Sequence, residues 1–130
     1  MILSKDQSSC IVEIAYSYLG YPFDWKTFNC MHFVRKVYRE VGIELPLIYK
    51  KIPLPFEFQL SESEFCLMPI GHIVFFKRRG SEADRLWTHV AIIANLTELI
   101  HCTRHLGNGV VVTSRDRFLN VYDLAPRRSR

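Results

Sequence analysis

The sequence predicts an α+β fold in which N-terminal helices pack on a C-terminal antiparallel β-sheet. Two observations support this prediction. Apolar residues recur at helical spacing within the first 42 residues, whereas from residue 71 onward they form the short runs that are typical of strands. A chain of 130 residues can bury roughly two-thirds of its unfolded surface in one core. We therefore expect a single domain over residues 1–130.

The first helix is expected over residues 5–19. Ser4 and Gln7 have the spacing of a capping box, and Leu3 is placed to pack against the first turn. Apolar residues then recur on one face as far as Gly20, a residue type that commonly follows the end of a helix.

The second helix is expected to begin at Cys30. Asn29 is a favoured N-cap residue, and the apolar residues that follow recur on one face until Gly42. The preceding residues 21–28 are rich in aromatic residues and contain a proline, which indicates a loop. Cys30 is therefore predicted to lie in the first turn, on the inward face, where unpaired backbone amides and the helix dipole stabilise a thiolate.

Residues 43–69 form a connector that is interrupted by prolines, with one short helix expected near residues 57–60. The apolar runs after this connector predict a sheet. The expected strands are residues 71–77, 87–94, 98–103, 110–113 and 120–124. Residues 126–130 are expected to form a frayed basic tail.

The composition limits the classes of partner. The net charge is +4, but the basic residues are scattered and no nucleic-acid-binding motif accompanies them, so no nucleic-acid partner is expected. No apolar run reaches the roughly 18 residues of a membrane span, so we expect no integral membrane association. The N-terminus lacks the basic and apolar regions of a signal peptide. We expect the protein to be cytoplasmic as synthesised, and to reach an external substrate through a secretion system, a phage or lysis.

The four cysteines include no CxxC pair, and their even number is weak evidence for a disulfide framework. Cys10 and Cys102 are expected to be buried free thiols because each falls on an apolar pattern. A metal site could draw on Cys30, His32, His101 and Cys102, but their spacings match no ordinary zinc motif. We therefore expect no metal and no cofactor.

Cys30, His89 and His101 form the candidate catalytic set. A thiol is mostly protonated at neutral pH, so a thiol nucleophile needs a helix N-terminus that stabilises the thiolate and an imidazole that takes the proton. His89 and His101 lie in two of the apolar runs that follow Cys30. They are twelve residues apart, so they share a face of the sheet if the connecting turn has an odd number of residues or a bulge.

Six segments resemble, in the same order, those of the NlpC-type cell-wall cysteine peptidases. They are Leu19–Trp25, Asn29–Cys30, Val41–Pro46, Gly71–Phe76, Thr88–Ile92 and Leu99–His101. The resemblance implies a papain-like fold, with Cys30 as nucleophile, His89 as base and His101 as the residue that orients the base. It also implies hydrolysis of amide bonds in peptidoglycan stem peptides, commonly after γ-D-glutamate. The expected partners are peptidoglycan or muropeptides and an immunity protein or inhibitor.

The chain departs from the family pattern at several positions. The family typically has Asp before the nucleophile and Ser-Gly after it, whereas this chain has Asn29 and Met31-His32. The Asp that follows the strand glycine is replaced by His72, and the tyrosine of the Pro-Tyr loop is replaced by Phe23. These departures concern the substrate more than catalysis. The residues expected to bind substrate are Phe23, Trp25, His32 and His72.

Two alternatives remain open. The run Asn29, Cys30, His32 and Phe33 also resembles the lecithin:retinol acyltransferase-like branch, whose members act on acyl groups of lipids. In that branch the histidine precedes the cysteine, whereas here His89 follows Cys30. The second alternative is a non-catalytic binding module that keeps the papain-like shape.

Overall fold

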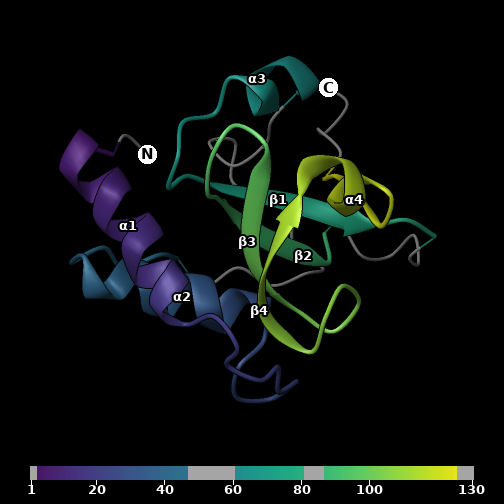
Figure 1. The fold of residues 1–130 in the computed structure, drawn as a ribbon, viewed down its shortest axis with the longest axis horizontal. Coiled ribbons are helices and arrows are strands. Elements are labelled where there is room, and N and C mark those ends of the chain that lie inside the picture. Colours follow the sequence, from purple (N-terminus) through teal and green to yellow (C-terminus); the bar gives the residue numbers. More distant parts are fainter. Residues whose placement is uncertain (1–2, 47–60, 81–86, 126–130) are drawn as a thin grey trace.

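The computed structural model of the protein describes residues 3–46, 61–80 and 87–125. A five-stranded antiparallel sheet forms the centre of the fold, as Figure 1 shows. The helices α1 (Lys5–Ser17) and α2 (Cys30–Glu40) cover one face of this sheet, and the short helices α3 (Glu62–Cys66) and α4 (Arg115–Leu119) lie against the other. The predicted α+β fold with N-terminal helices on a C-terminal sheet is confirmed.

The two long helices begin where side chains satisfy their first backbone amides. Ser4 Oγ accepts a hydrogen bond from the Gln7 amide, and the Gln7 side chain accepts one from the Ser4 amide. Asn29 Oδ1 accepts from the amides of Met31 and His32 at the start of α2. Both predicted N-termini are therefore confirmed. Each N-cap side chain accepts hydrogen bonds from backbone amides that would otherwise lack a partner at the start of the helix.

The strands are β1 (Ile73–Arg78), β2 (His89–Ile93), β3 (Glu98–Thr103), β4 (Gly109–Ser114) and β5 (Tyr122–Leu124). Their order in the sheet is β4-β3-β2-β1-β5. The first four strands therefore follow one another as a meander, and β5 returns to pair with the outer side of β1. All five predicted strands are present, with ends that differ from the prediction by at most two residues.

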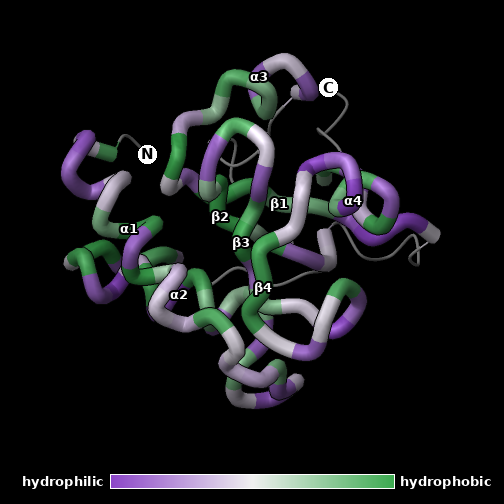
Figure 2. The backbone as a smooth tube through the Cα atoms, viewed as in Figure 1, coloured by the Kyte–Doolittle hydropathy of each residue, from purple (hydrophilic) through white to green (hydrophobic). Residues whose placement is uncertain are grey.

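Apolar side chains pack on both faces of the sheet, because successive side chains along a strand point to opposite faces. In Figure 2 much of the backbone of the central strands has the green colour of hydrophobic residues. On the α2 side, Phe75, Val90 and Ile100 pack with the long helices. On the opposite side, Phe76 and Ala91 pack with Phe118 of α4 and Phe65 of α3. Residues with even numbers on β1 and odd numbers on β2 and β3 therefore belong to the α4 side of the sheet.

The local structure departs from the sequence predictions at Cys10 and at α4. Cys10 is exposed, so its expected burial is wrong: it lies beside the apolar stripe of α1 rather than on it. The sequence pattern missed α4, which is too short to show a helical period and begins at a Ser114 cap. The expected helix near residues 57–60 and the expected tail at 126–130 lie outside the described residues.

Within the described ranges, none of the helices combines the length and the hydrophobicity that a crossing of the bilayer requires.

Candidate active site

Cys30 is the first residue of α2 and is buried. Its position follows from the Asn29 cap, which sets the start of the helix one residue before the thiol. Two neighbouring amides point to Asn29 Oδ1, and the Asn29 amide in turn donates to Nδ1 of His32 at 3.2 Å. The thiol therefore lies at the positive end of the helix dipole, where a thiolate is stabilised.

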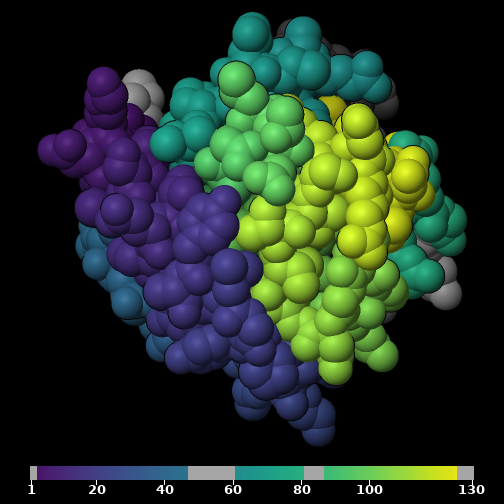
Figure 3. Space-filling view, viewed as in Figure 1, coloured from purple at the N-terminus to yellow at the C-terminus, as the bar shows by residue number. Residues whose placement is uncertain are grey.

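The loop before Cys30 is attached to the edge of the sheet. The Gly20 amide donates to the Val110 carbonyl at 3.1 Å, and the Val110 amide donates back to the Tyr21 carbonyl at 2.9 Å. The Phe23 amide donates to the Asn108 carbonyl at 3.2 Å. Figure 3 shows the N-terminal part of the chain packed directly against the yellow-green β4 region. These bonds place the start of α2 relative to the strands that carry the histidines.

The two histidines meet on the α4 side of the sheet. Nε2 of His89 lies 2.6 Å from Nδ1 of His101, which is hydrogen-bond distance, and both rings are buried. The sequence required an odd number of residues in the connecting turn if both histidines were to share a face of the sheet. Ile93 pairs with Leu99, and the five residues 94–98 between them meet this condition. The structure thus brings together the two imidazoles that the sequence placed on separate strands.

Two further residues, Thr113 and Tyr122, hold this pair, and neither was predicted from the sequence. His101 Nε2 lies 2.8 Å from Oγ1 of Thr113 on β4. The ring of Tyr122 on β5 stacks on the His89 ring, with 4.4 Å between centroids and 10° between planes. The Tyr122 hydroxyl lies 3.1 Å from Oγ1 of Thr103. Both imidazoles are therefore held in fixed orientations by neighbouring strands.

The sequence contains only a weak signal for these two residues. Thr113 is a polar residue inside an apolar strand, and its β4 neighbour Val111 lies opposite His101. Thr113 is two residues further along the same face, within diagonal reach of the imidazole. Tyr122 becomes a neighbour of His89 only through the return of β5 to β1, which periodicity does not reveal.

Burial sets the protonation of the groups around the pair. It lowers the pKa of His101 to about 3, so this imidazole is neutral at physiological pH. Burial also raises the pKa of Tyr122 to about 12, and the negative charge of an ionised Cys30 adds to that increase. The same two causes raise the pKa of Cys102 to about 12. Cys30 therefore lies close enough to both residues to act on them electrostatically.

Cys102 is a buried free thiol, as predicted, and its Sγ donates to the Phe28 carbonyl at 3.4 Å. With its pKa raised, Cys102 remains protonated and is a poor nucleophile at neutral pH. Of the two neighbouring buried thiols, only Cys30 lies at a helix N-terminus.

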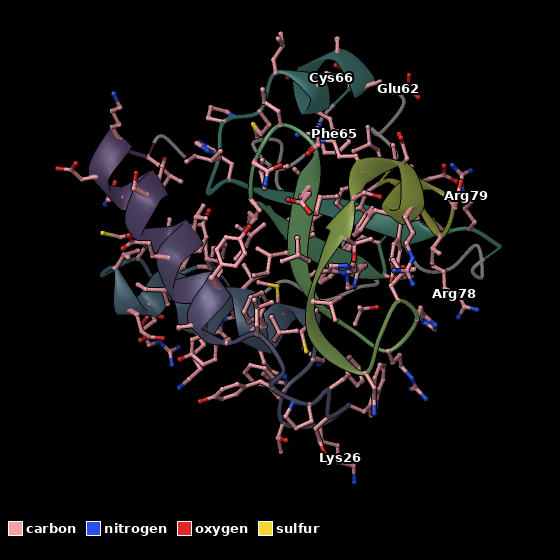
Figure 4. All side chains as sticks on the ribbon, in the orientation of Figure 1. Lys26, Glu62, Phe65, Cys66, Arg78 and Arg79 are labelled. Atoms are coloured by element: carbon pink, nitrogen blue, oxygen red, sulfur yellow. The ribbon has the colours of Figure 1, made fainter. Side chains whose placement is uncertain are left out.

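The residues predicted to bind substrate lie in three different places. Phe23 is half-buried under the Arg104 guanidinium, 5.8 Å from its ring centroid. Trp25 is 54% exposed on the same loop, whose neighbouring Lys26 extends away from the molecule in Figure 4. His32 completes the cap of α2. His72 directly precedes β1, and its carbonyl accepts a hydrogen bond from the Ile93 amide. Ile93 is the last residue of β2, whereas His89 is the first. Phe23 and Trp25 thus share the loop that leads to Cys30, whereas His72 lies apart from the histidine pair.

No group of three or more metal-binding side chains occurs within residues 3–46, 61–80 and 87–125. His32 and His101, two of the candidate ligands, use ring nitrogens in the helix cap and in the histidine pair.

Comparison of the sequence with protein-family models and with curated proteins gave no match. Solved structures do match. An NLP/P60-family protein similar to a lipoprotein, from Staphylococcus aureus, has a TM-score of 0.65 at 20% identity, over 98% of this chain and 44% of its own. The NlpC/p60 domain of the peptidoglycan hydrolase SagA has a TM-score of 0.61 at 24% identity, over 92% and 98%.

An NlpC/P60-family protein from Bacillus cereus has a TM-score of 0.61 at 20% identity, over 92% of this chain and 39% of its own. The chain thus spans less than half of the Staphylococcus and Bacillus proteins, and nearly all of the SagA domain. Together with the arrangement of helices and sheet described above, these matches show that the chain has the papain-like α+β fold of the NlpC/P60 proteins.

Proposed function

We propose that this protein is a cysteine hydrolase that cleaves amide bonds in peptidoglycan stem peptides, with the bond after γ-D-glutamate as the expected target. The observation that carries the proposal is the combination of two features in one fold. Cys30 is a buried thiol at a capped helix N-terminus, and His89 and His101 form a buried, hydrogen-bonded pair. The SagA domain, which matches along nearly its whole length, comes from a peptidoglycan hydrolase. The net charge of +4 suits an anionic wall polymer.

The proposed reaction is acyl transfer in two steps. The Cys30 thiolate attacks the amide carbonyl, its proton having passed to His89, and a C–S bond forms. The Cys30 amide and a neighbouring donor stabilise the oxyanion. His89 then protonates the departing amine, the C–N bond breaks and a thioester remains. In the second step His89 takes a proton from water, whose oxygen attacks the thioester carbon. The C–S bond breaks, the acid leaves, and the proton on His89 is shared again with the Cys30 sulfur.

His101 supports His89 without carrying charge. Because its pKa is far below neutrality, His101 stabilises the imidazolium of His89 only through a hydrogen bond. A carboxylate in this place would add a full charge interaction. The thiolate must therefore depend largely on the N-terminus of α2 for its stabilisation.

The proposal is tested with purified sacculi and soluble muropeptides, digested side by side and analysed by mass spectrometry. Cys30→Ala is expected to lower the rate by several orders of magnitude while the circular dichroism spectrum is retained, because only a small buried group is removed. Cys66→Ala is the matched control, since Cys66 is an exposed thiol at the end of α3.

Retention of more than about a tenth of the activity by Cys30→Ala would exclude this thiol as the nucleophile, since a tenth corresponds to only about 1.4 kcal/mol of barrier. Products from phospholipids instead of muropeptides would point to the acyltransferase-like alternative. A Cys30 thiol that does not react with iodoacetamide at neutral pH would favour the non-catalytic module.

A further inference from the structure

We propose that Thr113 is a positioning residue of the active site: its hydroxyl oxygen accepts a hydrogen bond from Nε2–H of His101, which leaves Nδ1 of His101 free to accept a hydrogen bond from His89. This inference rests on the proposed cysteine hydrolase function. It extends the site by one residue, from β2 and β3 to the edge strand β4.

The geometry supplies a continuous chain of hydrogen bonds. His89 Nε2 and His101 Nδ1 are 2.6 Å apart, and His101 Nε2 and Thr113 Oγ1 are 2.8 Å apart. His101 is 0% exposed and Thr113 is 2% exposed, so water does not compete for these atoms. The Phe118 ring packs against the edge of His101, with 4.9 Å between centroids, and restricts its rotation.

The protonation of His101 gives Thr113 its role. A neutral imidazole carries one N–H, so His101 can donate at only one of its two nitrogens. When Cys30 is ionised and His89 is an imidazolium, His89 donates from Nε2 and needs an acceptor at Nδ1 of His101. The proton of His101 must then lie on Nε2, and Thr113 Oγ1 is the atom placed to accept it.

The other tautomer is unproductive. If Thr113 donated to Nε2, the proton of His101 would lie on Nδ1 and point at Nε2 of His89. His89 would then carry its own proton on Nδ1, and it could not take a second one from the thiol without losing the bond to His101. A threonine hydroxyl supports the productive tautomer, whereas an isosteric methyl group leaves the Nε2 proton buried without an acceptor.

The test compares Thr113→Val, Thr113→Ser and the control Thr97→Val in the full chain. Thr97 lies in the turn between β2 and β3, and its hydroxyl donates to Oδ1 of Asn95, away from the histidine pair. The measurement is the rate of Cys30 alkylation by iodoacetamide between about pH 5 and pH 9, followed at this residue by peptide mass spectrometry. Tyr122 and Cys102 stay protonated over this range, because burial raises the pKa of each to about 12.

We expect Thr113→Val to raise the pKa of the Cys30 thiol by about one unit and to lower kcat about tenfold on muropeptides, because the thiolate–imidazolium pair loses its support. Thr113→Ser should stay within about twofold of the wild type in both measurements. Thr97→Val should leave the thiol titration and kcat unchanged, because its hydroxyl contacts neither histidine.

An unchanged thiol titration in Thr113→Val would overturn the role of Thr113, and so would an equal upward shift in Thr97→Val. Neither result depends on a substrate. If the wild-type thiol itself titrates like a free cysteine, at about pH 8.5, the proposed hydrolase function fails instead. If Thr113→Val does not fold, failure of Thr113→Ser to keep a wild-type titration would overturn the inference.

Discussion

His101 has a hydrogen-bond partner at each ring nitrogen and an aromatic ring against its edge. Its side chain therefore contributes in two ways that can be separated by substitution. One contribution is the hydrogen bond that it makes with His89. The other is the volume that it fills between Phe118 and the sheet.

We predict that His101→Asn or His101→Gln keeps a measurable share of activity, since either amide can still meet Nε2 of His89. His101→Ala should lose more, because His89 is then free to rotate or change tautomer. The loss should appear in kcat instead of KM, as expected for a group that acts through geometry in the transition state. Steady-state kinetics on muropeptides makes the comparison. Equal activity of Ala, Asn and wild type would remove His101 from the site.

Among the elements, the loop between α1 and α2 depends on its close approach to β4. A Cβ atom added to Gly109 would collide with the Tyr21 carbonyl oxygen. We predict that Gly109→Ala displaces this loop, lowers the free energy of unfolding by about 2–4 kcal/mol and slows Cys30 alkylation. Urea unfolding and iodoacetamide labelling measure the two effects.

Gly42→Ala is the control for this prediction. Gly42 has a φ of +82°, and an added Cβ would meet nothing within 4 Å. This variant should cost only the strain of a left-handed residue, about 1–2 kcal/mol, and alkylation should be unchanged. A Gly109→Ala protein that labels as fast as the wild type would show that the loop does not hold the thiol in place.

The same elements show what a sequence can and cannot indicate. The start of α2 was predictable because the Asn29 cap and the apolar period are local, and Cys30 followed from them. Whether His89 and His101 share a face of the sheet depends on the register of β2 and β3, in which Ile93 pairs with Leu99. The sequence allowed this register but also allowed others. Tyr122 reaches His89 through a non-local strand pairing, and Thr113 reaches His101 through diagonal contact across β3 and β4. No periodicity carries such information.

The molecule as a whole should be sensitive to acid through His101. Its pKa is about 3 in the folded protein against 6.5 for an ordinary histidine, so below about pH 6.5 the unfolded chain binds a proton that the folded one does not. The stability that depends on neutral His101 is therefore complete above pH 6.5 and is lost as the pH falls toward 3. The expected slope approaches about 1.4 kcal/mol per pH unit.

Urea unfolding of the wild type and of His101→Asn, at about pH 7 and about pH 5, tests this expectation. The variant should be the less stable protein at pH 7, because it loses packing against Phe118. The difference between the two proteins should shrink at pH 5, since asparagine does not titrate. Parallel losses of stability in both proteins would mean that other groups account for the acid sensitivity.

The attachment of residues 20–23 to β4 has a consequence for association between molecules. An edge strand normally presents a row of unpaired amides and carbonyls that can template the addition of a strand from another chain. Here the segment that leads to Cys30 forms hydrogen bonds with both the amide and the carbonyl of Val110. It also forms a β-bridge between Pro22 and Gly109. The opposite edge is β5, a strand of only three residues. The segment that positions the proposed nucleophile thus also covers the start of β4 and leaves a shorter stretch of this edge open to another strand.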